Sequence, residues 1–324
     1  MNIAIITSGG DSPGMNPCIA QLVKEATSCK HKVFAYERGF LGIRDHNIYE
    51  LNINKVQDWY KLGGTMLRTG RFPELSELKW QKQLSDNLKA DGIDVLIVIG
   101  GDGSFTGALL FNQEFGFPVM GIPGTIDNDI YGTTYTLGYD TALNTVVEAI
   151  DKIRDTASSH NRMFFIEVMG RDAGFLALNS GIGGGAEKIL IPEQHSTLED
   201  LVNEIAINHN KGKMSNIIVV AEGYTTGQNV YELKKYVEAQ NPDYDIRVTV
   251  LGHIQRGGAP TCFDRVLASR MGVKAVESLL EGKSNYMVGI NNDKIDLTPL
   301  EKAIKGGESK LDPDLIRIAK IMSV

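Results

Sequence analysis

The chain contains VLIVIGGDGS at Val95–Ser104 and, shortly after it, FPVMGIPGTIDND at Phe117–Asp129. Each segment opens with an apolar run of strand length and then changes to glycine and aspartate. Such a run is typical of a buried parallel strand. The change in composition marks its carboxyl end, where open α/β sheets bind their ligands. The sequence therefore predicts two neighbouring strand-end loops that carry polar chemistry.

The residue types in these loops indicate phosphate and metal binding. Glycine lets backbone N–H groups approach phosphate oxygens, and carboxylates are ligands for Mg²⁺. Asp102 is either an Asp-Gly turn residue or a metal ligand, and its place beside a second acidic loop favours the metal ligand. Asp127 and Asp129 flank one residue, and on an extended loop such alternate positions point the same way. One carboxylate could then accept a proton from an attacking hydroxyl while the other supports metal or substrate geometry, as phosphoryl transfer requires.

Around these loops, β-like runs alternate with helical patterns from end to end. Helices are predicted at Thr141–Thr156, Leu198–His209 and Arg265–Leu280 from apolar residues three or four apart. The alternation predicts mostly parallel sheets covered by helices on both faces, and 324 residues suggest two lobes. The expected strands are Ile3–Ile6, Lys32–Tyr36, Val95–Gly100, Val119–Ile122, Met163–Met169, Lys188–Ile191, Ile217–Ala221, Arg247–Leu251 and Tyr286–Ile290.

Composition narrows the class of protein. The apolar runs are too short to span a bilayer, and the first residues lead directly into a strand, so no signal peptide is read. Three cysteines without CxxC spacing are typical of reduced thiols in the cytoplasm. A net charge of −7 argues against a general nucleic-acid or membrane surface, so an anionic substrate must meet local arginines.

Other candidate residues are ambiguous when taken singly. TSGGDSPGMN at Thr7–Asn16 lies between a strand and a helix and lacks GxGxxG spacing, so it is either a tight turn or a nucleotide loop. His253 is a structural imidazole or a ligand, and Glu222 is a helix-capping neighbour or an acceptor for a sugar hydroxyl. Guanidinium groups near strand ends or glycine turns suit phosphate binding, and the candidates are Arg71, Arg162, Arg171, Arg247 and Arg256.

Taken together, the motifs resemble those of the bacterial-type ATP-dependent 6-phosphofructokinases over essentially the whole chain. The matching segments, in the family's order, are TSGGDSPGMN, GGTMLRTGRFPE, IGGDGS, PGTIDNDI, EVMGR, AEG and TVLGHIQRGG. The resemblance implies Mg²⁺-assisted transfer of a phosphoryl group from ATP to the 1-hydroxyl of fructose 6-phosphate, the committed step of glycolysis, by a cytoplasmic, allosteric homotetramer. It also implies two Rossmann-like lobes with the active site in the cleft between them. The expected bounds are 1–138 plus about 255–305 for a larger ATP-binding lobe and 139–254 plus about 306–324 for a smaller fructose 6-phosphate-binding lobe.

The resemblance assigns roles around the nucleotide. Asp102 would coordinate Mg²⁺, and Gly9 and Arg71 would also contribute to catalysis. The full set implied for the ATP site is Gly9, Phe40, Arg71, Phe72, Gly101, Asp102, Gly103 and Ser104.

It assigns further roles around the sugar phosphate. Asp127 would be the base that takes the proton of the 1-hydroxyl, while Thr125 and Arg171 would stabilise the transferred phosphoryl group. The remaining substrate residues would bind the sugar, its 6-phosphate or, for Arg162 and Arg247, the 6-phosphate in a neighbouring subunit. They are Asp129, Arg162, Met169, Gly170, Glu222, Arg247, His253 and Arg256.

Departures from the family pattern concern the donor and the effector site. Pyrophosphate-using relatives carry Asp and Lys where Gly103 and Gly124 stand, so ATP is the expected donor. Two family arginines of the effector site correspond to Ala20 and Ile53, which predicts weak or absent control by ADP and phosphoenolpyruvate. At two further effector positions, Lys24 stands where the family has arginine and Ser215 where it has histidine. The effector residues that match the family are Arg154, Glu187, Lys211 and Lys213.

Three other functions remain open on sequence alone. They are a pyrophosphate-dependent phosphofructokinase, an NAD- or lipid-kinase relative that shares GGDG, and a catalytically inactive sugar-phosphate sensor. PGTIDND and GHIQRGG disfavour the second, and the intact set of Asp102, Asp127 and Asp129 disfavours the third.

Overall fold

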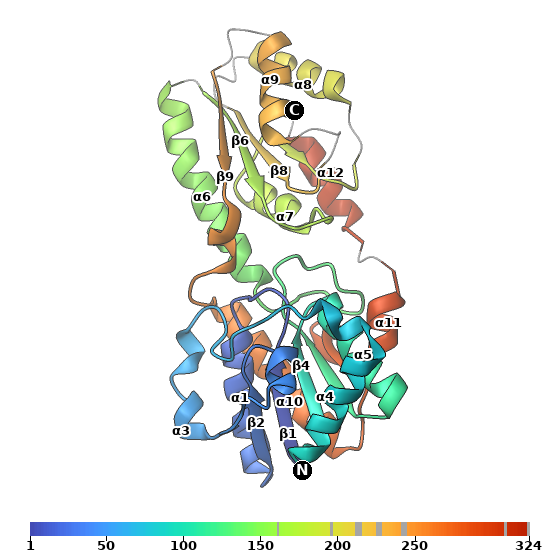
Figure 1. Ribbon diagram of the computed structural model, residues 1–324. Coiled ribbons are helices and arrows are strands. Elements are labelled where there is room, and N and C mark those ends of the chain that lie inside the picture. Colours follow the sequence, from blue (N-terminus) through green and yellow to red (C-terminus); the bar gives the residue numbers. More distant parts are fainter. Residues whose placement is uncertain are drawn as a thin grey trace. The chain divides into compact units, whose positions relative to one another are not determined.

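The computed structural model describes residues 1–160, 162–194, 197–210, 216–224, 229–240, 245–307 and 310–322. The chain divides into two compact units (Figure 1). Unit 1 comprises Met1–Thr141 and Arg256–Ser309, and unit 2 comprises Ala142–Gln255 and Lys310–Val324.

Unit 1 is built on a mainly parallel sheet. Its strand order is β11-β10-β5-β4-β1-β2-β3. The five strands from β10 to β2 in this order are parallel, and the edge strands β11 and β3 pair antiparallel to their neighbours. The strands are β1 (Asn2–Thr7), β2 (Lys32–Tyr36), β3 (Ile48–Leu51), β4 (Val95–Gly100), β5 (Val119–Pro123), β10 (Tyr286–Asn291) and β11 (Lys294–Pro299). The helices are α1 (Met15–Ser28), α2 (Phe40–Arg44), α3 (Ile53–Val56), η1 (Trp59–Lys61), η2 (Pro73–Ser76), α4 (Leu78–Ala90), α5 (Asp102–Phe115), α10 (Cys262–Leu280) and α11 (Leu300–Lys305).

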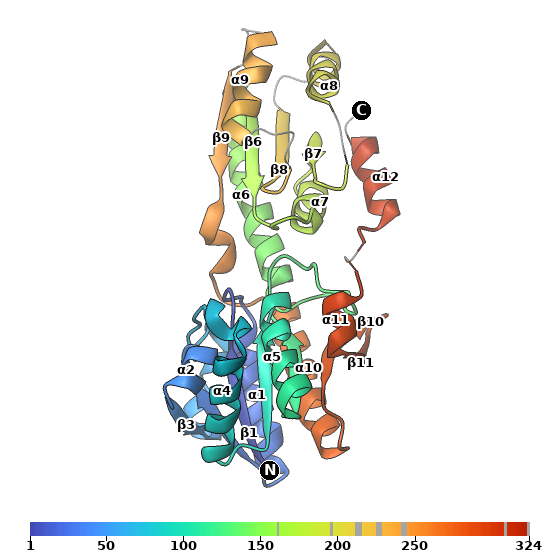
Figure 2. The same cartoon turned by 45° about the vertical axis from the view of Figure 1, so that its right-hand side comes forward.

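Helices cover both faces of this sheet (Figures 1 and 2). Ile3 and Ile5 of β1 pack with α1 and α10 on one face, whereas Ala4 and Ile6 pack with α2, α4, α5 and α11 on the other. Successive side chains of a strand point to opposite faces, so a strand buried on both faces must be apolar throughout. This explains the continuous apolar runs of β1 and β4.

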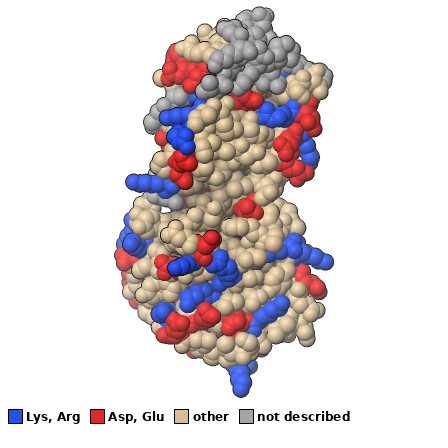
Figure 3. Space-filling model, turned by 180° about the vertical axis from the view of Figure 1, so that it is seen from behind, with Lys and Arg blue, Asp and Glu red and all other residues tan. Residues whose placement is uncertain are grey.

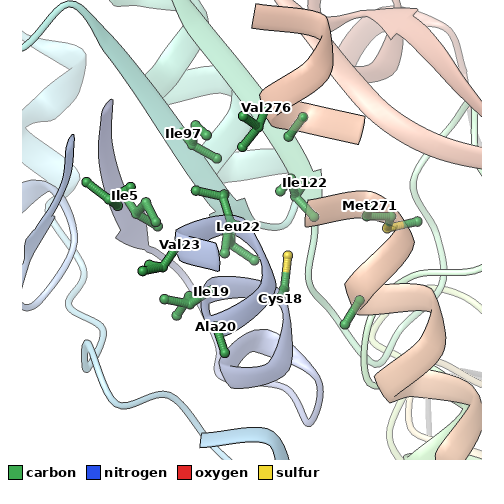
Figure 4. Packing of buried hydrophobic residues seen from close by; sticks show 14 of the residues in the cluster. Ile5, Cys18, Ile19, Ala20, Leu22, Val23, Ile97, Ile122, Met271 and Val276 are labelled. Carbon is green, nitrogen blue, oxygen red and sulfur yellow. The ribbon is translucent and has the colours of Figure 1, made fainter. Parts of the chain in front are cut away.

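The close approach of α1 and α10 depends on small residues. Figure 4 shows Cys18 and Leu22 of α1 between Met271 of α10 and the sheet residues Ile97 and Ile122, all in one cluster. A Cβ atom added to Gly272 would lie 2.9 Å from the carbonyl oxygen of Cys18. Glycine at this position therefore allows the two helices to pack at short range and seals one face of the sheet.

Unit 2 has a smaller parallel sheet, with the order β7-β8-β6-β9 among the described residues. Its strands are β6 (Met163–Val168), β7 (Lys188–Leu190), β8 (Asn216–Ala221) and β9 (Ile246–Val250). The remaining helices are α6 (Tyr139–His160), α7 (Phe175–Gly183), α8 (Leu198–Asn210), α9 (Val230–Gln240), η3 (Gly252–Arg256) and α12 (Pro313–Met322). The chain enters unit 2 along α6 and leaves it through η3.

The fold class expected from the sequence is confirmed, because both sheets are mostly parallel and flanked by helices. Each expected strand is present, but β3 and β11 were not predicted. Within the described ranges, no helix is long and apolar enough to cross a membrane.

Candidate active site

In unit 1, three glycine-rich loops leave the carboxyl ends of β1, β4 and β5, which are neighbours in the sheet. The Ser8 N–H donates to the Ile99 carbonyl at 3.0 Å, and the Gly124 N–H donates to the Gly100 carbonyl at 3.0 Å. These bonds continue the strand pairing into the loops. Residues predicted separately from the sequence are thereby held at one edge of the sheet.

The loop after β1 brings two other segments close to its backbone. Gly9 has φ +83°, and a Cβ at this position would lie 3.2 Å from Ser104 Oγ. A Cβ at Gly10 would lie 2.5 Å from an Arg256 guanidinium nitrogen, which also lies 3.4 Å from the Asp11 carbonyl oxygen. A side chain at position 10 would therefore displace the Arg256 guanidinium group from this loop.

The loop after β4 opens directly into α5. Asp102 is the first residue of this helix, and Asp102 and Gly103 are exposed while Ser104 is buried. A helix N-terminus presents unsatisfied N–H groups and a positive dipole end, which suits a phosphate. The exposed carboxylate fits a Mg²⁺ ion that also binds nucleotide phosphates, since oxygen ligands suit this ion. Within the described ranges, no group of three or more His, Cys, Asp or Glu side chains could hold a metal without such outside ligands.

The loop after β5 carries Thr125, Asp127 and Asp129. The first two are 9% and 2% exposed, so the proposed base lies in a nearly dry environment. The assumption of an extended loop is wrong, because Asn128 has φ +56°, in the left-handed region. Asn tolerates this conformation better than most residues, and it makes a tight turn between the two aspartates.

The remaining expected nucleotide residues lie in two different settings. Phe40 is 3% exposed and stacks on Phe111 of α5 at a ring-centroid distance of 5.8 Å, so its ring is part of the core. Arg71 is exposed, and Phe72 is half-buried with its ring 5.6 Å from that of Trp80.

Asn16 holds the loop that leads to Arg71, and the sequence analysis missed this residue. Its amide donates to the carbonyls of Leu62 and Gly63 at 3.0 and 3.1 Å and accepts from the Met66 N–H at 2.7 Å. Thr69 of the same loop donates from its hydroxyl to the Gly9 carbonyl.

In unit 2, the expected sugar residues Met169, Gly170 and Arg171 form one turn after β6. Glu222 Oε1 accepts from the N–H groups of Gly170 and Arg171 at 3.2 and 2.7 Å. Gln255 accepts from the Met169 N–H at 3.1 Å. Glu222 therefore shapes the turn, in addition to any contact with a sugar. Burial, together with the nearby Glu222 carboxylate, raises the pKa of Glu167 in β6.

Gln255 is a second residue that sequence reasoning missed. It is fully buried within η3, where His253 is exposed, and its amide also donates to the Gly252 carbonyl at 2.9 Å. Its burial and its contact with Met169 are set by the fold, so no local sequence pattern marked this residue.

Arg162 and Arg247 share one carboxylate. Asp245 Oδ2 lies 2.7 Å from Arg162 Nε, and Asp245 Oδ1 lies 3.0 Å from Arg247. The pairing of β6 with β9 places Phe164 opposite Arg247, which explains why the two arginines lie close together. Chiefly through its hydrogen bond, Arg162 holds the pKa of Asp245 below its usual range.

The expected effector residues are only partly described. Arg154 pairs with Glu187 at 3.0 Å and donates to the carbonyls of Gly184 and Gly185 in unit 2. In unit 1, the Lys24 ammonium lies 4.6 Å from the ring centroid of Tyr60. Lys211, Lys213 and Ser215 lie outside the described residues.

Figure 3 shows basic and acidic side chains interspersed over both units on the face that it presents. The fold and these loops define an α/β protein of the phosphoryl-transfer class.

The chain belongs to the phosphofructokinase family, whose family profile matches residues 2–279. It is 48% identical over 322 residues to the ATP-dependent 6-phosphofructokinase 2 of Bacteroides thetaiotaomicron, covering 99% of this chain and 98% of that protein. It is 49% identical over 322 residues to the ATP-dependent 6-phosphofructokinase of Listeria welshimeri, covering 99% of each chain. The solved phosphofructokinase of Saccharomyces cerevisiae matches 99% of this chain with a TM-score of 0.87 and 34% identity, and this chain spans 48% of that yeast chain.

Proposed function

We propose that this chain is an ATP-dependent 6-phosphofructokinase. It transfers the γ-phosphoryl group of ATP to the 1-hydroxyl of fructose 6-phosphate, giving fructose 1,6-bisphosphate and ADP. The observation that carries this proposal is the buried Asp127 in the loop after β5. The adjacent strand, β4, leads into the GGDG loop, at which α5 begins. Full-length identity of 48% to a protein named for this activity supports it.

The residues of unit 1 would act on the nucleotide and on the attacking hydroxyl. The N–H groups at the start of α5 and the backbone at Gly9 would bind phosphate oxygens, and Asp102 would hold Mg²⁺, whose charge would offset that of the transferring phosphoryl group. Asp127 accepts the proton of the 1-hydroxyl as the oxygen attacks. Its burial keeps water away from the transferring group.

The residues of unit 2 would bind the sugar phosphate. Glu222 fixes the backbone of the Met169–Arg171 turn, which holds Arg171 for the transferred phosphoryl group. His253 is the residue of this unit that the family resemblance implies for the 6-phosphate. Unit 1 is thus the proposed ATP-binding lobe, and unit 2 the proposed fructose 6-phosphate-binding lobe.

The activity is tested by a coupled assay for ADP formation with fructose 6-phosphate, comparing the native protein with Asp127→Ser. We expect kcat to fall by about 10²–10⁴ with a modest change in KM, because a positioned base contributes a factor of this size. Asp296→Ser, at an exposed site on the edge strand β11, serves as the control and should keep normal turnover. Near-normal turnover in Asp127→Ser would rule out the base assignment.

The same assay separates the competing functions. Turnover with pyrophosphate that exceeds turnover with ATP would indicate a pyrophosphate-dependent enzyme. Absence of turnover with either donor, with fructose 6-phosphate still bound, would indicate a sugar-phosphate sensor.

We further propose a cytoplasmic homotetramer in which Arg162 and Arg247 bind the 6-phosphate of a neighbouring subunit's substrate. The support is the family resemblance; the structure adds only that Asp245 holds the two arginines close together. Hybrids of Arg162→Ala and Asp127→Ser subunits should then regain activity, because some sites combine an intact base with an intact arginine. Hybrids that form, by native mass spectrometry, but stay inactive would contradict a shared site.

A further inference from the structure

The turn between Asp127 and Asp129 is braced by a buried network that the reaction chemistry does not itself explain. Asn128 is 6% exposed, and its Oδ1 accepts from the N–H of Thr136 at 2.8 Å. Its Nδ2 donates to the Thr134 carbonyl at 3.0 Å. With the amide turned over, its NH₂ group would face the Thr136 N–H and its oxygen would face the Thr134 carbonyl. The two contacts therefore fix the orientation of the side chain.

Thr136 holds the same loop at a second point. This residue is fully buried, and its hydroxyl lies 2.7 Å from the Thr125 carbonyl and 3.2 Å from Asn128 Oδ1. Both partners are acceptors, so the one hydroxyl hydrogen serves both, with the shorter contact to Thr125. Thr136 therefore bridges the residues on either side of Asp127.

The segment that carries Thr136 is itself fixed to the core. The Leu137 N–H donates to the Pro123 carbonyl at 2.8 Å, and the Gly138 N–H donates to Asp264 at 2.9 Å. Thr133 accepts from the Ile290 N–H in β10 at 3.0 Å. The brace at Thr136 thus reaches β5 through Leu137 and α10 through Gly138, whereas the bond of Thr133 fixes a separate part of the segment to β10.

We propose that Asn128 and Thr136 are positioning residues for the Asp127 base, acting by fixing the backbone on both sides of it. The inference rests on the proposed function, since it takes Asp127 as the base. A displacement of about 1 Å at a reacting group can cost about 10² in rate, so loss of the brace lowers kcat. Substrate affinity should change little, because both side chains are buried and make their hydrogen bonds within the protein.

The test compares Thr136→Val with Thr133→Val, since both buried threonines lie in the same segment and valine keeps their shape. Thr136→Val should lower kcat by about 10–100-fold with KM for both substrates within about threefold. Thr133→Val removes a bond to β10 instead, and kcat should stay within about twofold. Thr136→Ser keeps the hydroxyl and should restore turnover.

To distinguish an effect on the base from a general effect on the structure, Thr136→Val is also made in the Asp127→Ser protein. A residue that acts through the base loses its effect when the base is absent, so kcat should then change by less than about twofold. An equal drop in both backgrounds, or the same drop in Thr133→Val, overturns the inference. If Thr136→Val does not fold, Asn128→Gly replaces it, because glycine keeps the left-handed turn and lacks the amide.

The proposed function can fail separately. Near-normal turnover in Asp127→Ser removes the base assignment, and the inference falls with it. A normal loss in Asp127→Ser with unchanged turnover in Thr136→Val overturns the inference alone.

Discussion

Gly103, the second residue of α5, tests the choice of phosphoryl donor at the scale of one side chain. A Cβ atom added there meets no other atom within 4 Å, so a larger residue fits without moving the loop. Any effect of Gly103→Asp is therefore mainly electrostatic. A carboxylate close to nucleotide phosphates is repelled, and like charges within a few ångströms cost several kcal/mol when partly desolvated.

We expect Gly103→Asp to lower kcat/KM for ATP by about 10² or more. The neutral, equally sized Gly103→Asn serves as the control and should lose about tenfold or less. Equal losses in the two variants would contradict the electrostatic argument.

Single residues also show what the sequence could and could not reveal about the site. The placement of Asp102 and Asp127 after two neighbouring strands was predictable, because each follows its own apolar run within a few residues. Asn16, Asn128, Thr136 and Gln255 were missed as positioning residues, because their partners are distant in sequence or their role depends on a turn. Gln255, for example, binds the N–H of Met169, 86 residues away.

At the scale of elements, the strands that were missed share a physical cause. β3 and β11 are antiparallel edge strands, and the sequence of β11, KIDLTP, is largely exposed. Edge strands with one solvated side lack the continuous apolar run that marks a buried parallel strand. The interior of the sheet could thus be predicted, whereas its edges could not.

Within unit 1, helices α6 and α10 both begin in a hydrogen-bond network around Asp264. Its carboxylate accepts from the Gly138 N–H at 2.9 Å and from the Thr141 N–H at 2.8 Å, at the start of α6. Thr261 caps α10 and donates to Asp140 at 2.6 Å. Burial raises the pKa of Asp264 to about 6, although the hydrogen bonds from Thr141 and Gly138 oppose this shift.

The raised pKa predicts how stability responds to pH. The unfolded carboxyl titrates near pH ~3.9, so between that pH and about 6 the folded state holds a proton that the unfolded state has lost. This group's contribution to the free energy of unfolding therefore rises as pH falls from 7 to 4.5, by roughly 1–3 kcal/mol. Asp264→Asn cannot titrate and should lack this rise.

The measurement is denaturant unfolding at pH 7 and pH 5, followed by tryptophan fluorescence. Trp59 and Trp80 both lie in unit 1, so the signal reports the unit that contains Asp264. Parallel pH dependence in the native protein and Asp264→Asn would contradict the assignment of the shift to this residue.

At the scale of the whole molecule, the remaining question is regulation at the expected effector site. Arg154, the arginine retained there, is already occupied by Glu187 and by the carbonyls of Gly184 and Gly185. Glu187 in turn accepts from the Ile217 N–H at 2.7 Å. Ala20, at a family arginine position, is fully buried in the core between α1 and the sheet, so it supplies no donor.

We therefore expect weak or absent control by phosphoenolpyruvate and ADP, with catalysis intact. A hydrogen bond to a charged group contributes about 1.5–3 kcal/mol, so the loss of two arginines weakens effector binding by roughly 10²-fold or more. The measurement is a titration of phosphoenolpyruvate at sub-saturating fructose 6-phosphate, with Arg154→Ala as the matched variant. The two proteins should respond alike, since Arg154 is already paired.

Ile53 is 40% exposed, so Ile53→Arg can present a guanidinium group and should strengthen any residual response. Strong sigmoidal inhibition of the native protein by sub-millimolar phosphoenolpyruvate, abolished in Arg154→Ala, would show that the remaining basic residues suffice and that the prediction is wrong.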